Sequence, residues 1–357
     1  MSARRRIVAS APARANLLGN PSDLYGGAVV GCSVPLRAHV TIEAGEALTL
    51  HGGEQSVRLV ERADLTLRGD RFDAARAALA AEFGPASAGA PPLPALRICY
   101  RSEIPYGSGL AGSTALLAAL LVGLAAWRGE TLSPYHLAER SRATERQLLG
   151  VACGWVDPYL CSFGGFRYVD LGGKQRDDAA PGELYATVED LAPYVPELPF
   201  VLAFTGVAHH SGSVHAPIRR RWEDGEPAVV RAYQRMTALA REGKRALLHG
   251  DWAELGALFD ENHALTRELG GSGDADERLI AAARRAGASG AKLAGAGGGG
   301  TIVALWPDPD ASALEQALRR AGATALYRPA VEKGAGWEPS TFPPTGETLT
   351  VPTRPLS

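Results

Sequence analysis

Residues 107–112 read GSGLAG, a glycine-rich stretch with the spacing of a loop that binds phosphate. Gly107, Gly109 and Gly112 allow the backbone to bend and to approach an anion closely. The apolar residues that follow predict a helix beginning near Ser113, and unpaired N–H groups at a helix N-terminus attract negative charge. The stretch therefore indicates a phosphate site, although a plain strand-to-helix turn would have a similar composition.

The same residues match the GxGxxG pattern of dinucleotide-binding folds, which would make the protein an NAD-dependent oxidoreductase. That fold needs an acidic residue about twenty positions later, at the tip of a second strand. Glu130 has about that spacing but follows a helix. A Walker A loop is excluded because no GxxxxGK[ST] occurs in the chain.

Two further stretches are unusual, PARANLLGNPSDLYGG at residues 12–27 and AKLAGAGGGGTIVAL at residues 291–305. Together with the glycine loop, and in this order, they resemble the three motifs of the GHMP kinase superfamily, which includes galactokinase, homoserine kinase and mevalonate kinase. The resemblance implies an α+β fold of two domains, ribosomal-S5-like and then ferredoxin-like, with the site between them. It also implies that the glycine loop binds ATP.

Within the superfamily the chain is most similar to glucuronokinase. The shared features are GNPSD at residues 19–23, Gly112 in the phosphate loop, and the segment 210–226. The implied reaction is ATP-dependent phosphorylation of the anomeric hydroxyl of a uronic acid. A kinase for a neutral sugar or another small alcohol stays open, as does an ATP- and sugar-binding sensor without catalysis.

The family positions imply that Asp157 accepts the hydroxyl proton and that Arg14 pairs with it and stabilises the transferring phosphoryl group. A purely structural Asp–Arg pair is the alternative. Ser113 and Glu145 are the implied Mg²⁺ ligands, since Mg²⁺ prefers a few hard oxygen ligands completed by water. Ser113 could instead cap the helix, and Glu145 could be a surface partner of Arg142 or Arg146.

ATP is expected at the loop, and the acceptor at residues from all three stretches and from segment 210–226. Asp23 suits a sugar diol because a carboxylate accepts two hydroxyl hydrogen bonds, although an Asx turn is the alternative. A uronate carboxylate calls for an arginine, with Arg37, Arg219, Arg220 or Arg221 as candidates and a solvated helix face as their alternative. The full expectation is ATP at Pro105, Gly107, Ser108, Gly109, Leu110, Ala111, Gly112, Ser113 and Thr114, and the acceptor at Asn20, Ser22, Asp23, Tyr25, Gly26, His215, Arg219, Gly297 and Gly298.

Composition narrows the class of protein further. The chain has 357 residues, 46% of them hydrophobic, and a net charge of −2, so no overall field favours nucleic acid or an anionic membrane. Four cysteines without a CxxC pair suit a reducing compartment, and a cytoplasmic location is expected. His209, His210 and His215 cluster in the sequence but lack a further ligand for zinc.

The elements that must position these residues can be read from the pattern. The run Ala115 to Trp127 predicts a buried helix too short to span a bilayer, and Ser133 followed by Pro134 predicts the start of another helix. Residues 172–196, rich in Asp, Gly and Pro, predict the domain boundary. We expect an N-terminal ATP-binding domain at 1–180, a C-terminal domain at 190–333, and an irregular Pro-rich tail at 334–357.

Overall fold

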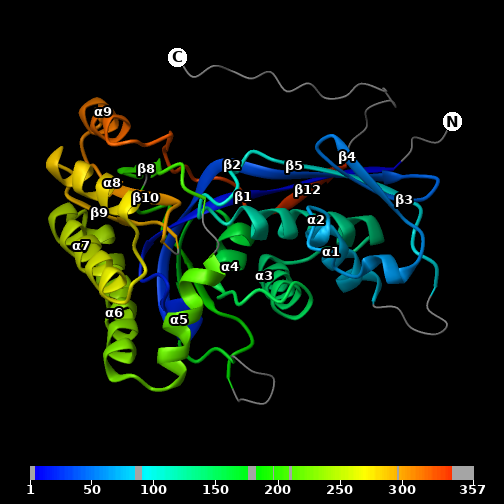
Figure 1. Ribbon diagram of the computed structural model, residues 1–357, viewed down its shortest axis with the longest axis horizontal. Helices are drawn as coiled ribbons and strands as arrows, with labels where there is room; N and C mark the ends of the chain where they lie inside the picture. Colours follow the sequence, from blue (N-terminus) through cyan, green and yellow to red (C-terminus); the bar gives the residue numbers. More distant parts are fainter. Residues whose placement is uncertain are drawn as a thin grey trace.

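The computed structural model describes residues 5–84, 91–175, 182–195, 197–208, 211–295 and 297–339, without the side chains of 211–215. The chain forms two β-sheets, each accompanied by its own helices (Figure 1). This is the α+β two-domain architecture expected from the sequence.

The larger sheet is built around two long strands that pair antiparallel, β1 (Arg6–Leu18) and β2 (Ala28–Ala44). A register shift between Pro12 and Ala13 lies just before Arg14, the residue that β1 contributes to the site. The strand order is β12 (Gly336–Pro339), β1, β2, β5 (Leu96–Ser102), β3 (Leu48–Gly52) and β4 (Gln55–Leu59), and β6 (Phe166–Asp170) pairs with β2 while β7 (Thr187–Asp190) pairs with β6.

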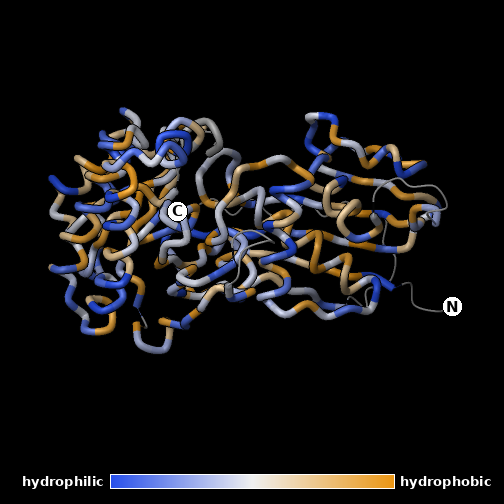
Figure 2. Tube along the Cα trace, turned by 90° about the horizontal axis from the view of Figure 1, so that it is seen from below, coloured by the Kyte–Doolittle hydropathy of each residue, from blue (hydrophilic) through white to orange (hydrophobic). Residues whose placement is uncertain are grey.

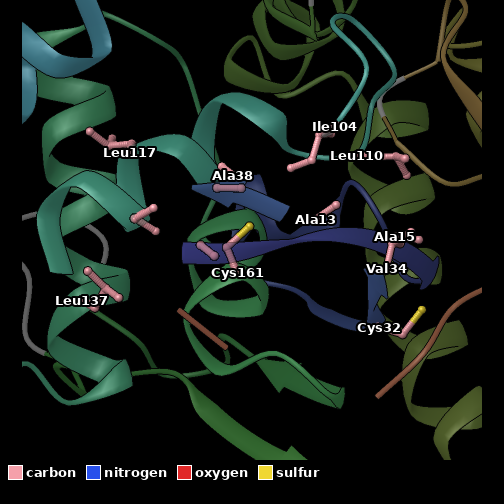
Figure 3. Packing of buried hydrophobic residues seen from close by; sticks show 14 of the residues in the cluster. Ala13, Ala15, Cys32, Val34, Ala38, Ile104, Leu110, Leu117, Leu137 and Cys161 are labelled. Atoms are coloured by element: carbon pink, nitrogen blue, oxygen red, sulfur yellow. The ribbon is translucent and has the colours of Figure 1, made fainter. Parts of the chain in front are cut away.

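Helices cover one face of this sheet, below the strands in Figure 1. The central one, α2 (Gly112–Arg128), is rich in Ala and Leu and packs on β1 and β2 with almost its whole length buried, as the run Ala115 to Trp127 predicts. Figure 3 shows Leu110 of the glycine loop in the same buried cluster as Ala13 and Ala15 of β1. The other elements in this layer are α1 (Asp73–Phe83), α3 (Pro134–Ala143), a π-helical turn (Thr144–Leu148) and α4 (Val156–Phe163), and two short 3₁₀ helices lie at Ser22–Tyr25 and Arg62–Leu65.

The smaller sheet and five helices form the second domain. Helices α8 (Asp274–Arg285) and α9 (Ser312–Arg320) bury one apolar face against this sheet, with Leu279, Ile280, Leu314 and Leu318 in one cluster. Figure 2 shows the alternating hydrophilic and hydrophobic segments that such amphipathic helices produce. The strand order is β11 (Ala325–Tyr327), β8 (Phe200–Phe204), β10 (Thr301–Leu305) and β9 (Gly290–Leu293), and the helices are α5 (Ser211–Glu223), α6 (Pro227–His249), α7 (Trp252–Glu268), α8 (Asp274–Arg285) and α9 (Ser312–Arg320).

The domain limits differ from the expected 1–180, 190–333 and 334–357 in two places. Strand β7, at 187–190, pairs with β6 and so belongs to the first sheet, and the second sheet begins only at Phe200. Residues 336–339 are not an irregular tail, because they form β12 and pair with β1. Pairing over more than 300 residues of sequence leaves no local signal in the tail. Residues 340–357 lie outside the described residues.

Helix α3 begins as expected, with the Ser133 hydroxyl accepting a hydrogen bond from the His136 N–H at 3.2 Å and Pro134 at its first turn. It does not continue as a regular helix to Gly150, because the π-helical turn follows Ala143. Among the described residues, no helix has both the length and the apolar character needed to cross a membrane.

Candidate active site

The glycine loop between β5 and α2 is shaped to receive an anion. Gly107, Gly109 and Ala111 take left-handed φ angles of 67°, 72° and 60°, and such an angle is uncommon for alanine. Helix α2 begins at Gly112 without any side-chain cap, so Ser113 does not act as its N-cap. The first turn of α2 therefore keeps backbone N–H groups that a phosphate can satisfy.

Two neighbours complete this loop. Ser108 is buried, and its hydroxyl has no hydrogen-bond partner in the described part of the chain. Its carbonyl accepts a hydrogen bond from the Thr301 hydroxyl of the second domain at 2.8 Å. Gly295 lies so close that a Cβ there would be 2.7 Å from the carbonyl oxygen of Gly109. The second domain thus holds the loop in place from one side.

Arg14 and Asp157 meet directly beside the loop. The Arg14 guanidinium donates from Nε and Nη2 to the two oxygens of Asp157 at 2.7 and 2.5 Å, and from Nη1 to the carbonyl of Gly109 at 2.6 Å. Arg14 is buried, while the Asp157 side chain is 31% exposed. Burial alone would lower the pKa of Arg14, but the charge and hydrogen bonds of Asp157 outweigh it and raise the pKa. The pair links the phosphate loop to the N-terminus of α4.

Glu145 lies on the π-helical turn and points inward, with only 3% of its surface exposed. Its Oε1 accepts a hydrogen bond from the Thr114 hydroxyl at 2.7 Å, and the Cys153 thiol lies against the carboxylate, whereas Oε2 is buried without a hydrogen bond of normal geometry among the described residues. Burial, with a smaller contribution from the charge of Asp157, raises the pKa of Glu145 to about 7. An orphaned carboxylate oxygen beside a phosphate loop is the donor type that Mg²⁺ takes, so Glu145 fits the expected metal.

The two expected Mg²⁺ ligands differ in burial, because Glu145 is buried and Ser113 is exposed. Ser113 is exposed on the first turn of α2, and Thr114, expected only as an ATP contact, is the residue that bonds Glu145. No group of three or more His, Cys, Asp or Glu side chains within the described residues could hold a metal ion. A magnesium ion here would take its remaining ligands from nucleotide phosphates and water.

Asp23 is 5% exposed and lies at the N-terminus of α4, where its Oδ2 accepts the Val156 N–H at 3.1 Å. Burial first, and then the charge of Asp157, raise its pKa to about 6. The Asx turn, the alternative to a sugar contact, is replaced by the 3₁₀ helix at Ser22–Tyr25, which has no side-chain cap. Asp23 therefore supports the backbone next to Asp157, in addition to any contact with a sugar.

We expect Asp23→Asn to stabilise the protein at pH 8, because Asn can still accept the Val156 N–H and carries no charge. The folded pKa of Asp23 is raised from 3.8 to about 6, so its contribution is fully favourable below 3.8 and is lost as pH rises through 6. The difference between variant and wild type should grow between about pH 4 and 6 and level off at about 3 kcal/mol above that range. Urea unfolding at several pH values measures it, and a difference independent of pH would contradict this prediction.

Several other expected acceptor contacts are used within the fold. The Asn20 side chain accepts from Lys292 Nζ at 2.7 Å and donates to the Gly295 carbonyl at 3.3 Å, which ties the two domains together. Ser22 is fully buried and donates to the Ala28 carbonyl at 3.1 Å. Gly26 ends the 3₁₀ helix with φ 83°. These three residues shape the loop that carries Asp23, and their hydrogen bonds here are to protein groups.

Gly297 and Gly298, expected as acceptor contacts, pack against protein backbone. A Cβ on Gly297 would lie 1.7 Å from the carbonyl oxygen of Gly271, and the Cα of Gly298 lies 3.4 Å from the Cβ position of Gly273. The glycine run is thus packed against the turn before α8. The side chain of His215, like those of His209 and His210, lies outside the described residues.

A pocket of about 240 Å³ opens beside Asp23 and the start of α4. Tyr25 forms part of it, with its ring centroid 4.4 Å from that of Trp222 and 4.2 Å from that of Tyr233. Of the four arginines proposed for a carboxylate, Arg219 lines the pocket, whereas Arg37 bonds the carbonyls of Lys333 and Gly334. The full lining is Leu24, Tyr25, Arg142, Arg146, Ala152, Cys153, Trp155, Arg219, Trp222 and Glu223.

Sequence reasoning missed Arg142, Arg146 and Trp155 as pocket residues. Both arginines had been considered only as surface partners of Glu145. Their position on either side of Glu145, three residues before it and one after, was the available signal. That signal becomes informative only when the π-helical turn is known, because the turn sets which way each side chain points.

Comparison with known proteins now identifies the family. Family models described as GHMP kinases N terminal domain and GHMP kinases C terminal match residues 71–165 and 244–324. A mevalonate kinase of Pyrococcus horikoshii is 30% identical over 320 residues, covering 84% of this chain and 89% of the relative. The chain belongs to the GHMP kinase family, and it is an ATP-dependent phosphotransferase with an alcohol group as acceptor.

Two other similar proteins differ in the acceptor that their names give. Glucuronokinase 1 of Arabidopsis thaliana is 27% identical over 330 residues, covering 87% of this chain and 89% of the relative. The crystal structure of Lactococcus lactis galactokinase with galactose superimposes with a TM-score of 0.77 at 18% identity, covering 92% of this chain and 94% of that one. The likeness to galactokinase concerns the fold alone. GHMP kinases use ATP, typically with Mg²⁺.

Proposed function

We propose that the protein phosphorylates the anomeric hydroxyl of a uronic acid, giving a sugar 1-phosphate and ADP. The observation that carries the proposal is the pocket at the start of α4, lined by Trp155, in which aromatic rings and arginines occur together. Tyr25 and Trp222 pack against each other in the lining and give the pocket an apolar wall against which a sugar ring can lie. Arginine side chains recognise carboxylates through their paired N–H donors.

In this mechanism the glycine loop and the first turn of α2 bind the ATP phosphates through backbone N–H groups. Arg14, fixed on Asp157 and the Gly109 carbonyl, offsets negative charge at the transferring phosphoryl group. Asp157 accepts the proton of the acceptor hydroxyl as the oxygen–phosphorus bond forms, and ADP leaves. Glu145 would hold Mg²⁺, with the exposed Ser113 as the second proposed ligand, and the bound ion would neutralise phosphate charge.

Phosphorylation of mevalonate is the second candidate, and the identity to the Pyrococcus horikoshii enzyme favours it. Mevalonate also carries a carboxylate, so arginines in the pocket suit both acceptors. The aromatic side chains in the lining, Tyr25, Trp155 and Trp222, favour the uronic acid, because a flexible chain without a ring covers less apolar surface. A neutral sugar would leave the arginines without an anionic partner.

The test is a coupled ADP-release assay with ATP and Mg²⁺ across glucuronate, galacturonate, glucose, galactose, arabinose and mevalonate. Turnover of a uronic acid in clear preference to its neutral counterpart is the expected result. Preference for mevalonate would replace the uronic acid with the second candidate. ATP binding without turnover of any acceptor would leave a non-catalytic ATP- and sugar-binding sensor as the function.

A further inference from the structure

Arg142 occupies an unusual position on one side of the pocket. Its guanidinium carbon lies 3.3 Å from the ring centroid of Trp155, so the two groups are in contact. Lys174 Nζ lies 5.5 Å from the same ring, but this lysine bonds Glu139 at 3.1 Å and the Leu184 carbonyl at 2.7 Å. Arg142, in contrast, has no ion pair or hydrogen bond in the described part of the chain, and its Nε is buried. Burial lowers its pKa.

Two more donors near Arg142 have no protein partner among the described residues. Arg146 lies four residues later, lines the same pocket, is exposed to solvent, and has no ion pair or hydrogen bond there. The indole N–H of Trp155 is buried without a partner there, although the residue is only 3% exposed. An unpaired buried donor is costly, and two neighbouring cations repel each other. An anion with several oxygens in this pocket would relieve both costs.

The remaining charges of the pocket do not supply that anion. Glu223 is the only carboxylate among the lining residues, and it already pairs with Arg219 at 2.7 Å across one turn of α5. Arg219, the arginine expected from the sequence, is therefore partly compensated. Among the described lining residues, Arg142 and Arg146 are the cations without an ion pair, and the charges of Glu139 and Asp23 compensate Arg142 only from a distance.

We propose that Arg142, Arg146 and the indole N–H of Trp155 form an acid subsite that binds the carboxylate of the acceptor. The inference rests on the proposed function and identifies how the acid is recognised. Trp155 precedes Asp157 by two residues. In a pyranose ring the carbon that bears the carboxylate and the anomeric carbon both flank the ring oxygen, so a carboxylate held at the subsite would fix the position of the anomeric hydroxyl relative to Asp157.

The experiment compares Arg142→Met, Arg142→Lys and Arg146→Met with wild type, using glucuronate, glucose and mevalonate. Glucose differs from glucuronate only where the carboxylate stands. Loss of charge-assisted hydrogen bonds should lower kcat/KM for glucuronate about 10- to 100-fold in Arg142→Met, chiefly through KM. Activity on glucose should change less than about 3-fold by the same reasoning. Arg142→Lys keeps the charge and should fall between Arg142→Met and wild type.

Binding without catalysis gives a second measurement. Glucuronate without ATP should raise the Tm of wild type and of the control Arg278→Met, whose side chain is exposed on α8, but not that of Arg142→Met. Equal losses on glucuronate and glucose, or a raised KM for ATP, would overturn the subsite. Arg142-dependent use of mevalonate alone would keep the subsite and overturn the uronic acid. Tm protection by glucuronate without its turnover would keep the subsite and overturn the uronic acid as the substrate.

Discussion

Asp157→Asn is expected to lower kcat about 10²- to 10⁴-fold, the range for losing a general base. Asn is nearly the same size and can accept one hydrogen bond from Arg14, but it cannot take up the hydroxyl proton. The variant also breaks the two-bond contact that fixes the Arg14 guanidinium against the Gly109 carbonyl. Both effects act on the transition state, so KM for ATP should change little. The coupled ADP-release assay with a turned-over acceptor measures the loss.

A matched control separates chemistry from folding. Asp190 on β7 also pairs with an arginine, Arg167, at 2.8 Å. Its side chain is 45% exposed, and the residue belongs to the β6–β7 pair, which contributes no residue to the site. Asp190→Asn should keep full turnover, because exposed ion pairs contribute little. If Asp157→Asn kept wild-type kcat with an unchanged Tm, Asp157 would leave the catalytic set and the Asp–Arg pair would be structural.

The contact between Arg14 and Asp157 could be predicted from the sequence, since both residues occupy family motif positions and a buried arginine needs a partner. The helix over 112–128 was equally predictable from its apolar run. The helix follows from the local sequence of residues 112–128, and the Arg14–Asp157 contact follows from motifs whose positions identify the two partners.

The rest depends on contacts that no short stretch encodes. Asn20 has the spacing of a substrate contact, yet the fold places it against Lys292, 272 positions later, where both amide ends are used within the protein. The π-helical turn at 144–148 turns Glu145 inward and leaves Arg146 at the pocket. One residue more or less in that turn would exchange these faces, so the pocket lining could not be predicted from residue types alone.

Glu145→Gln should raise the Mg²⁺ concentration for half-maximal velocity about 10- to 100-fold or more, since even indirect ligand supports contribute that much. Gln keeps the Oε1 acceptor for the Thr114 hydroxyl, which holds the side chain inward. It replaces the buried, unpartnered Oε2 with an uncharged group, so the metal site loses its charged ligand. Velocity measured against Mg²⁺ at saturating ATP and acceptor gives the shift.

Glu145→Gln should weaken the use of Mg²⁺ without lowering the stability of the protein, so a loss of activity cannot be attributed to unfolding. Removing a buried charge lowers the cost of folding, so the metal-free variant should unfold at a Tm no lower than that of wild type. Glu189→Gln is the matched control, because Glu189 pairs with Lys244 on the surface at 2.9 Å with 44% of its side chain exposed. It should leave the Mg²⁺ dependence unchanged. An unchanged Mg²⁺ dependence in Glu145→Gln would remove Glu145 as a ligand, and Thr114 would then hold a carboxylate whose role is to shape the loop.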